Sequence, residues 1–159
     1  MTAMYRIGLT LLLSMALLGV DGCSHQAGNP KSPEDPLTLE APDEVEAGQT
    51  VNLKLIWRNL TDKPAELNLG GRPPYDFVVT TDEGKEVWRW LAGQTVQDIL
   101  EIKTVDPGQK LEFMLEWQPV DQAGAPLTPG HYLAQGILNL DPPATLKTKP
   151  KPLIIRNKK

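Results

Sequence analysis

The stretch that decides the fold is Tyr75-Asp76-Phe77-Val78-Val79-Thr80-Thr81-Asp82-Glu83-Gly84-Lys85-Glu86-Val87-Trp88-Arg89-Trp90. Two runs rich in strand-forming residues flank a turn that contains glycine, which is typical of a β-hairpin. A four-residue loop at 82–85 pairs Val79 with Trp88. It also pairs Phe77 with Trp90, so these four apolar side chains share one face and Arg89 lies on the other. A slip of one residue would scatter the aromatic side chains, so the sequence predicts this register.

The period of two that defines a strand continues on both sides of this hairpin. Val51–Trp57 and Leu111–Trp117 alternate apolar and polar residues, and a shorter run occupies 65–69. Turn residues separate the runs at Gly48, Gly70-Gly71, Pro73-Pro74, Gly84, Pro107-Gly108, Pro129-Gly130 and Pro142-Pro143. Seven to nine short strands with such regular turns predict an all-β fold, an antiparallel β-sandwich. A helical turn is expected only within Ala92–Ile102.

A tyrosine segment near the C-terminus refines this prediction. Thr128-Pro129-Gly130-His131-Tyr132-Leu133-Ala134 resembles the entry to strand F of an immunoglobulin domain, where a tyrosine hydroxyl bonds back to the backbone. Ala134 stands where the second cysteine of that domain would be. Because Cys23 is the one cysteine of the chain, we expect an immunoglobulin-like sandwich without a disulfide. The alternative is that Tyr132 merely begins an edge strand.

The N-terminal sequence predicts export. Ile7–Val20 is uncharged, follows Arg6 and closes at Cys23; its apolar run of about 14 residues is typical of a signal peptide. It is shorter than the roughly 20 residues of a membrane-spanning helix. Val20-Asp21-Gly22-Cys23 resembles the lipobox of bacterial lipoproteins, which implies cleavage before Cys23 and lipidation of its thiol. Asp21 departs from the small or apolar residue usual there, and the alternative is an ordinary signal peptide with a thiol nearby.

These features predict three parts: a signal peptide at 1–22, a lipidated cysteine with a flexible linker at 23–36, and a sandwich domain at 37–157. The linker is polar and rich in proline, with little to bury. Ser24 follows the cysteine in place of the aspartate that marks retention at the inner membrane in enteric bacteria. We therefore expect an exported, membrane-anchored lipoprotein at the outer membrane or cell surface.

Charge excludes one class of partner. The chain has 16 basic and 20 acidic residues and a net charge of −4, whereas nucleic-acid binding requires a basic domain. Acidic residues gather at 34–46 and basic residues at 147–159. The basic end is expected to be a solvated, frayed tail, and the alternative is contact with anionic lipid or a partner.

Residues for catalysis are scarce in the predicted domain. All serines of the chain lie in the signal or linker, at Ser14, Ser24 and Ser32, so the usual nucleophiles other than threonine are missing. His131 is the one histidine of the domain and is expected to face solvent. The acidic pairs Asp82-Glu83 and Asp98…Glu101 are typical of hairpin loops and exposed faces; the alternative is that they coordinate calcium or serve as acid and base. We expect no enzyme, no metal site and no cofactor.

The order of these segments, with Asn59–Pro64 and Pro107-Gly108-Gln109, resembles the BsuPI family, which is named for a Bacillus intracellular proteinase inhibitor. Its specific part is Tyr75–Trp90: a Tyr-Asp-Phe strand, a Gly turn and a Trp-Arg-Trp return strand. The resemblance spans about residues 45–140 and implies an immunoglobulin-like sandwich that inhibits a serine protease. The motif residues expected to be mainly structural are Tyr75, Asp76, Phe77, Trp88, Arg89 and Trp90.

Two functions follow from this resemblance and from the N-terminus. The first is a lipid-anchored proteinase inhibitor that inserts a loop into a protease cleft. Candidate loops are Gly70–Pro74, Leu91–Thr95 and Leu140–Thr145; Arg72 would enter an acidic specificity pocket, and Pro73 would resist cleavage. The second is a non-inhibitory module that binds another protein of the cell envelope.

Overall fold

The computed structural model describes residues 34–69, 73–95, 101–140 and 144–158. Residues 33–159 form one compact unit. The predicted signal peptide and Cys23 therefore lie outside the described residues. No helix in the described part is long and apolar enough to span a bilayer.

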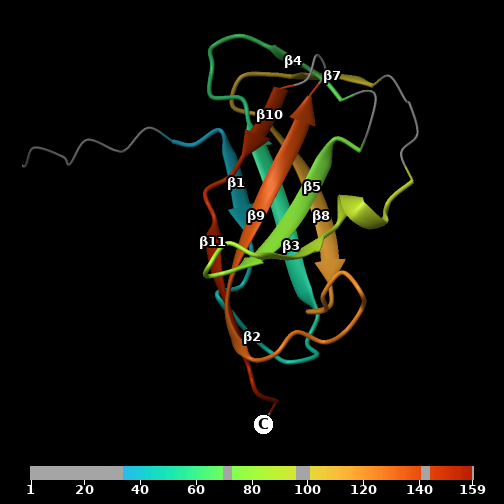
Figure 1. Cartoon of the computed structure of the whole chain (residues 1–159). Helices are drawn as coiled ribbons and strands as arrows, with labels where there is room; N and C mark the ends of the chain where they lie inside the picture. The colour runs from blue at the N-terminus through green and yellow to red at the C-terminus, as the bar shows by residue number, and fades with distance from the viewer. Residues whose placement is uncertain (1–33, 70–72, 96–100, 141–143, 159) are drawn as a thin grey trace, which may run out of the picture. The chain divides into compact units, whose positions relative to one another are not determined.

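The regular secondary structure of the described chain is almost wholly β-strand (Figure 1). In chain order these are β1 (Leu37–Glu40), β2 (Glu44–Glu46), β3 (Val51–Arg58), β4 (Ala65–Asn68), β5 (Tyr75–Thr81), β6 (Glu86–Arg89), the 3₁₀ turn η1 (Leu91–Gly93), β7 (Ile102–Val105), β8 (Lys110–Trp117), β9 (Gly130–Leu140), β10 (Ala144–Lys147) and β11 (Lys151–Arg156). η1 overlaps the start of the range 92–102 in which a helical turn was expected, and residues 96–100 of that range lie outside the described residues.

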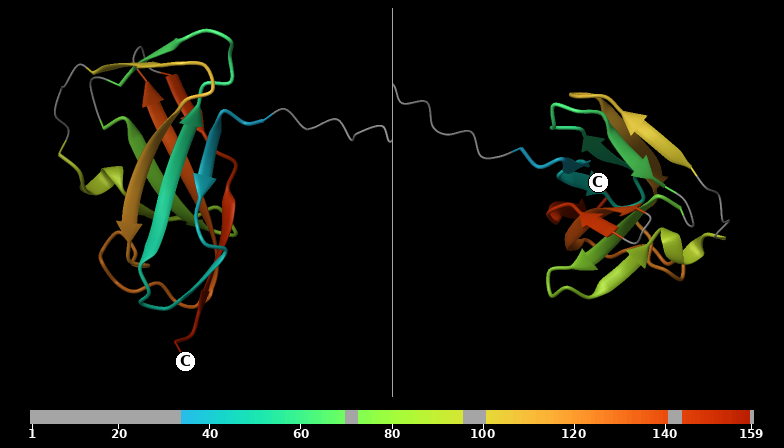
Figure 2. Two further views of the ribbon diagram at one scale, coloured as in Figure 1. Left: turned by 180° about the vertical axis from the view of Figure 1, so that it is seen from behind. Right: turned by 90° about the horizontal axis from the view of Figure 1, so that it is seen from above.

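The strands form two larger sheets that face each other as the layers of a sandwich (Figure 2). One sheet has the order β1-β3-β8. The other has the order β2-β11-β9-β5-β6, and β10 also pairs with β9. All pairs are antiparallel except β2 with β11. β4 and β7 form a separate two-stranded sheet. The predicted all-β, mainly antiparallel fold is confirmed.

The described residues form 11 strands, compared with the predicted seven to nine. The difference lies in short strands of three or four residues. β2 has three residues, and all four residues of β10 are exposed. β2 contributes one buried apolar residue and β10 none, so hydrophobic alternation does not reveal them.

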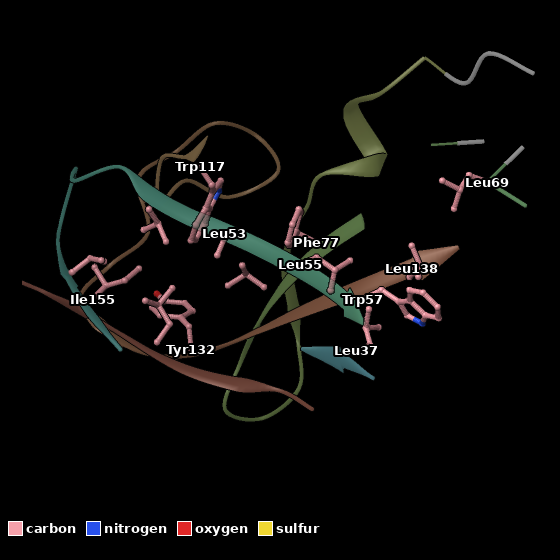
Figure 3. Packing of buried hydrophobic residues seen from close by; sticks show 14 of the residues in the cluster. Leu37, Leu53, Leu55, Trp57, Leu69, Phe77, Trp117, Tyr132, Leu138 and Ile155 are labelled. Atoms are coloured by element: carbon pink, nitrogen blue, oxygen red, sulfur yellow. The ribbon is translucent and has the colours of Figure 1, made fainter. Parts of the chain in front are cut away.

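The interior is filled from both inner faces of the sandwich (Figure 3). Its fully buried side chains include Leu53 and Leu55 on β3, Phe77 and Val79 on β5, and Leu138 on β9. Gly136 on β9 lies so near the opposite sheet that a Cβ there would meet Leu55 Cδ1 at 2.5 Å. The sheets therefore pack closely without a disulfide.

The register of the β5–β6 hairpin agrees with the prediction, since Val79 lies opposite Trp88 and Val78 opposite Arg89. The loop is shorter than predicted. The Thr81 amide donates to the Lys85 carbonyl at 2.9 Å, and Gly84 at φ 81° closes a three-residue turn. An irregularity between Val79 and Thr80 then adds one residue to β6 and restores the predicted pairing.

The tyrosine corner is present. The Tyr132 hydroxyl donates to the Thr128 carbonyl oxygen at 2.8 Å, and the ring is buried. Ala134, two residues further on, is 1% exposed. The hydrogen bond fixes the entry to β9 as it does in immunoglobulin domains, so Tyr132 does more than begin an edge strand.

The prediction of a frayed basic tail is wrong. β11 lies between β2 and β9, and its Leu153 and Ile155 are buried. Basic side chains on β11 and just before it form ion pairs with the acidic segment near the N-terminus: Lys149–Asp35, Lys151–Asp43 and Arg156–Glu44. The apolar run Leu153–Ile155 lies between the basic residues of this segment and supplies the buried face of the strand. A charge count alone could not distinguish such a strand from a tail.

Candidate functional site: the loop end of the sandwich

Two of the three candidate loops, Gly70–Pro74 and Leu140–Thr145, are flanked by described residues at the end of the sandwich where β4, β7 and β10 lie (Figure 1). The third, Leu91–Thr95, contains η1 and lies at the side of the sandwich. The backbone N–H of Asn139 donates to the Pro74 carbonyl oxygen at 2.7 Å, which joins the β4–β5 connection to the end of β9. The Leu69 amide donates to the Glu101 carbonyl at 2.7 Å, which joins the start of the β4–β5 connection to the segment before β7. Ala144 pairs with Leu140 across the β9–β10 connection. We call these flanking residues the loop end.

Parts of the loops themselves lie outside the described residues. Arg72, the predicted protease-contact residue, is among them, as are 70–71, 96–100 and 141–143. Pro73 is described and half-buried, and its carbonyl accepts a 3.4 Å hydrogen bond from the Asn139 side-chain amide. The structure thus shows how the base of the first loop is held.

A stack of aromatic rings supports the loop end from within. Tyr75 stacks on Trp90, with ring centroids 4.6 Å apart and planes inclined by 13°. Tyr75 also contacts Phe113 on the opposite sheet at 4.8 Å, and meets Phe77 edge-on at 5.8 Å. Offset and edge-on pairs of this kind add stability beyond the area they bury. The first residue of β5 and the last residue before η1 are therefore held together.

Asp76 is the buried polar centre of the motif. Its carboxylate is 2% exposed and accepts a 2.5 Å hydrogen bond from Arg89 Nη1. Its second oxygen accepts the backbone N–H of Leu91 at 2.9 Å. One carboxylate thereby connects β5 to β6 and to the first residue of η1, from which the exposed residues 92–95 follow.

Arg89 lies between two carboxylates. Its Nε and Nη2 donate to the two oxygens of Glu86 at 3.0 and 2.8 Å, while Nη1 reaches Asp76. The pKa of Glu86 is lowered, mainly by its hydrogen bond with Arg89, and the pKa of Arg89 is raised, first by Glu86 and then by Asp76. Both carboxylates hold the guanidinium in its charged form in one orientation.

The remaining motif residues contribute to the interior. Phe77 is buried, and Trp88 is half-buried against Trp117 with ring centroids 5.1 Å apart. The buried bond from Asp76 to Leu91 was missed by sequence reasoning. The predicted register contained a signal for the ion pair, because Arg89 opposite Val78 makes Asp76 a diagonal neighbour across the strands.

Asn59 is a second buried polar group that sequence reasoning missed. It is 1% exposed, and its amide donates to the carbonyls of Lys63 and Val105 at 2.7 and 2.8 Å. Its oxygen accepts from the amide and hydroxyl of Thr61. These bonds attach the turn after β3 to β7. Asn59 therefore stabilises this turn.

The described residues contain no cluster of three or more His, Cys, Asp or Glu side chains placed to hold a metal ion. His131 is exposed on β9. Of the acidic pairs considered for chemistry, Asp98 lies outside the described residues, and Glu101 forms an ion pair with Lys103 at 3.1 Å. Asp76 and Glu86 are both bound to Arg89.

This geometry defines a class of protein, a mainly antiparallel β-sandwich without a disulfide. The buried carboxylate of Asp76 and the stacked rings of Tyr75 and Trp90 stabilise the segments that flank its loops. The sequence model of the BsuPI family, described as intracellular proteinase inhibitor, matches residues 38–142. The chain belongs to this family. The family's description as proteinase inhibitor implies a binding role for its members rather than an enzymatic one. No curated protein sequence matches the chain significantly.

Several solved structures share a distant similarity. An alkylpurine DNA glycosylase from Pseudomonas fluorescens is 12% identical, with a TM-score of 0.43 over 76% of this chain and 30% of its own. The sporulation control protein Spo0M of Bacillus subtilis is 13% identical, with a TM-score of 0.43 over 77% of this chain and 48% of its own. A β-glucosidase from Listeria innocua is 11% identical, with a TM-score of 0.39 over 75% and 15%. The chain spans less than half the length of each, and similarity this low indicates nothing about its function.

Proposed function

We propose that the chain is a lipid-anchored proteinase inhibitor of the cell envelope. It inserts one or more of the three candidate loops into the cleft of a serine protease. The family match over 38–142 is the observation that carries the inhibitory part. Export and lipidation are supported by the sequence around Cys23. The family is described as intracellular, so an exported member would act on a different protease.

The bracing of the loop end supports a loop-in-cleft mechanism. An inhibitor gains affinity when its contact loop is already held in the bound conformation, because less conformational entropy is lost on binding. Here the bases of the loops are fixed by the Asn139–Pro74 hydrogen bond, the Tyr75–Trp90 stack and the Asp76–Leu91 hydrogen bond. Other sandwich domains likewise carry their binding loops on a rigid scaffold of strands.

Within this proposal Arg72 is the specificity residue and Pro73 follows it. An arginine side chain suits an acidic specificity pocket of the trypsin type. The next residue, Pro73, lacks a backbone N–H and restricts the conformation of Arg72, which disfavours the geometry needed for cleavage. The carbonyl of Pro73 is the group that Asn139 holds.

The test is titration of the sandwich unit, residues 33–159, against trypsin-like and subtilisin-like proteases. Arg72→Ala should abolish inhibition of the trypsin-like enzyme. Lys85→Ala is the matched control, since it removes the same charge from the β5–β6 turn at the other end of β5, and it should inhibit like the wild type. No inhibition by the wild type at micromolar concentration would refute the proposal. Pull-down of a non-protease envelope protein with this unit would favour the alternative, a non-inhibitory binding module.

The anchor has a separate test. Acylation of Cys23 would attach two or three chains, and each buried methylene contributes about 0.8 kcal/mol to membrane binding. Cys23→Ala in the full chain should therefore move the protein from the membrane fraction to the soluble fraction after export. Metabolic labelling with a fatty-acid analogue should mark the wild type and not the variant. A Cys23→Ala protein that stays with the membrane would show that the anchor is elsewhere.

A further inference from the structure

β8 differs from the other strands at the edges of the sheets. It has eight residues, Lys110–Trp117, whereas β1, β2, β6 and β10 have three or four. β6 is covered along its outer edge, because the Gln122 amide donates to the Val87 carbonyl and the Arg89 amide donates to the Gln122 side chain. In the described part of the chain, β8 pairs with β3 on one side and with no strand on the other. An edge of this length is a template for a further strand.

The direction of the free backbone groups follows from the register. Arg58 lies opposite Lys110, and one step further the Asn59 amide donates to the Gln109 carbonyl at 3.0 Å. Bonded pairs alternate in an antiparallel ladder, so odd-numbered residues of β8 bond to β3. The N–H and C=O groups of Lys110, Glu112, Met114 and Glu116 therefore point away from β3.

The side chains along this edge leave apolar surface exposed. Met114 is 71% exposed on the outer face of the sheet. On the inner face Leu111, Phe113 and Leu115 pack against the core but are only half-buried. A strand added beside β8 would cover these side chains.

The charges along β8 are complementary to those of a second copy of this chain. In an antiparallel pair of two β8 strands centred on Phe113, Lys110 of each copy lies opposite Glu116 of the other, which forms two attractive pairs. The same register sets Leu111 opposite Leu115 on the inner face. Moving the centre to Met114 would set Glu112 opposite Glu116 twice. Like charges directly opposite each other are destabilising. Among the registers that overlap most of the strand, the one centred on Phe113 is therefore favoured.

We propose that the sandwich forms a two-fold symmetric dimer by antiparallel pairing of β8 with β8, centred on Phe113. The contact is isologous, as expected for a closed dimer. It joins the two β1-β3-β8 sheets into one continuous sheet and covers the half-buried strip at Leu111, Phe113 and Leu115. Because the paired strands run in opposite directions, the two loop ends point away from each other and both stay open. This inference is independent of the proposed protease inhibition.

The experiment is sedimentation equilibrium of the sandwich unit, residues 33–159, over a range reaching high micromolar concentration. The wild type should approach twice the monomer mass. Lys110→Glu and Glu116→Lys each turn both attractive pairs into repulsive ones, which should weaken self-association roughly ten-fold or more. Lys85→Glu, the same charge reversal on the β5–β6 turn, should dimerise like the wild type.

Mixing the two β8 variants gives the decisive result. In a heterodimer of K110E with E116K, both cross-copy pairs are again of opposite charge, so an equimolar mixture should recover the dimer that neither variant forms alone. This restoration would not follow from damage to the fold, and equal urea midpoints of the variants would check the fold directly. A wild type that stays monomeric, variants that dimerise as tightly as the wild type, or a mixture that fails to recover the dimer would each overturn the proposal.

Discussion

Asp76 gives the sharpest test of how the hairpin motif stabilises the protein. Its carboxylate is 2% exposed and binds both Arg89 Nη1 and the Leu91 amide. Glu86 binds the same arginine through two oxygens, but its side chain is 46% exposed. The two acidic residues thus share one partner and differ in burial, so replacing each with alanine separates the effect of burial from that of charge.

The structure sets the expected magnitudes. A hydrogen bond to a charged group contributes about 1.5 to 3 kcal/mol and an ordinary one about 1 kcal/mol, and regained solvation of a buried carboxylate offsets part of the sum. Asp76→Ala should therefore lower the free energy of unfolding by about 2 to 3 kcal/mol. Glu86→Ala should lower it by less than about 1 kcal/mol, because solvent screens an exposed pair. Asp76→Asn keeps an acceptor for the Leu91 amide and should fall between them.

The assay is urea denaturation of the sandwich unit followed by tryptophan fluorescence, with the three variants measured beside the wild type. A free-energy change for Glu86→Ala as large as that for Asp76→Ala would refute the reasoning, since burial would then make no difference. A loss below about 1 kcal/mol for Asp76→Ala would show that the buried ion pair is no better than a surface pair.

Three further predictions concern single contacts. The hydrogen bond with Arg89 lowers the pKa of Glu86. The stabilisation by ionised Glu86 is therefore fully present above the ordinary glutamate pKa of 4.5 and is lost as the pH falls through the lowered pKa. The difference in unfolding free energy between the wild type and Glu86→Ala should vanish when both are measured at decreasing pH. Tyr132→Phe should cost about 1 kcal/mol in urea denaturation, because it removes one hydrogen bond and little volume. Gly136→Ala should cost about 1 to 3 kcal/mol, since its Cβ would overlap Leu55 in a packed core; a melting temperature equal to that of the wild type would contradict the close approach of the two sheets.

The parts of the fold that follow a strict period were predictable from the sequence. Val51–Trp57 and Leu111–Trp117 lie in β3 and β8, and their registers pair Val51 with Trp117. The hairpin register was predictable because four large apolar side chains fit one face in only one alignment. The tyrosine corner was predictable because its hydrogen bond is local, spanning four residues.

The contacts that the sequence did not reveal depend on tertiary pairing. The position of β11 between β2 and β9 requires a parallel pair between the two ends of the chain, and no local pattern reports a contact over that separation. The loop end is similar: the Asn139–Pro74 and Leu69–Glu101 bonds join segments that only the folded topology brings together. Nor does the period of two distinguish the edge strand β8 from the central strand β3, because it reports only which face of a strand is buried.

The residues by which the sequence resembles its family have a role beyond marking the fold. Tyr75 and Trp90 stack where β5 begins and η1 follows, and Asp76 binds the first amide of η1. A Tyr-Asp-Phe strand paired with a Trp-Arg-Trp strand therefore fixes the geometry at the base of two of the three candidate loops. A substitution at Asp76 should alter binding through the loop end as well as stability. Gly136→Ala is the control, because it destabilises the core away from the loops. If Asp76 acts on the loops, Asp76→Asn should inhibit the protease less well than Gly136→Ala when both variants are folded. Equal inhibition by the two folded variants would leave the motif with a purely structural role.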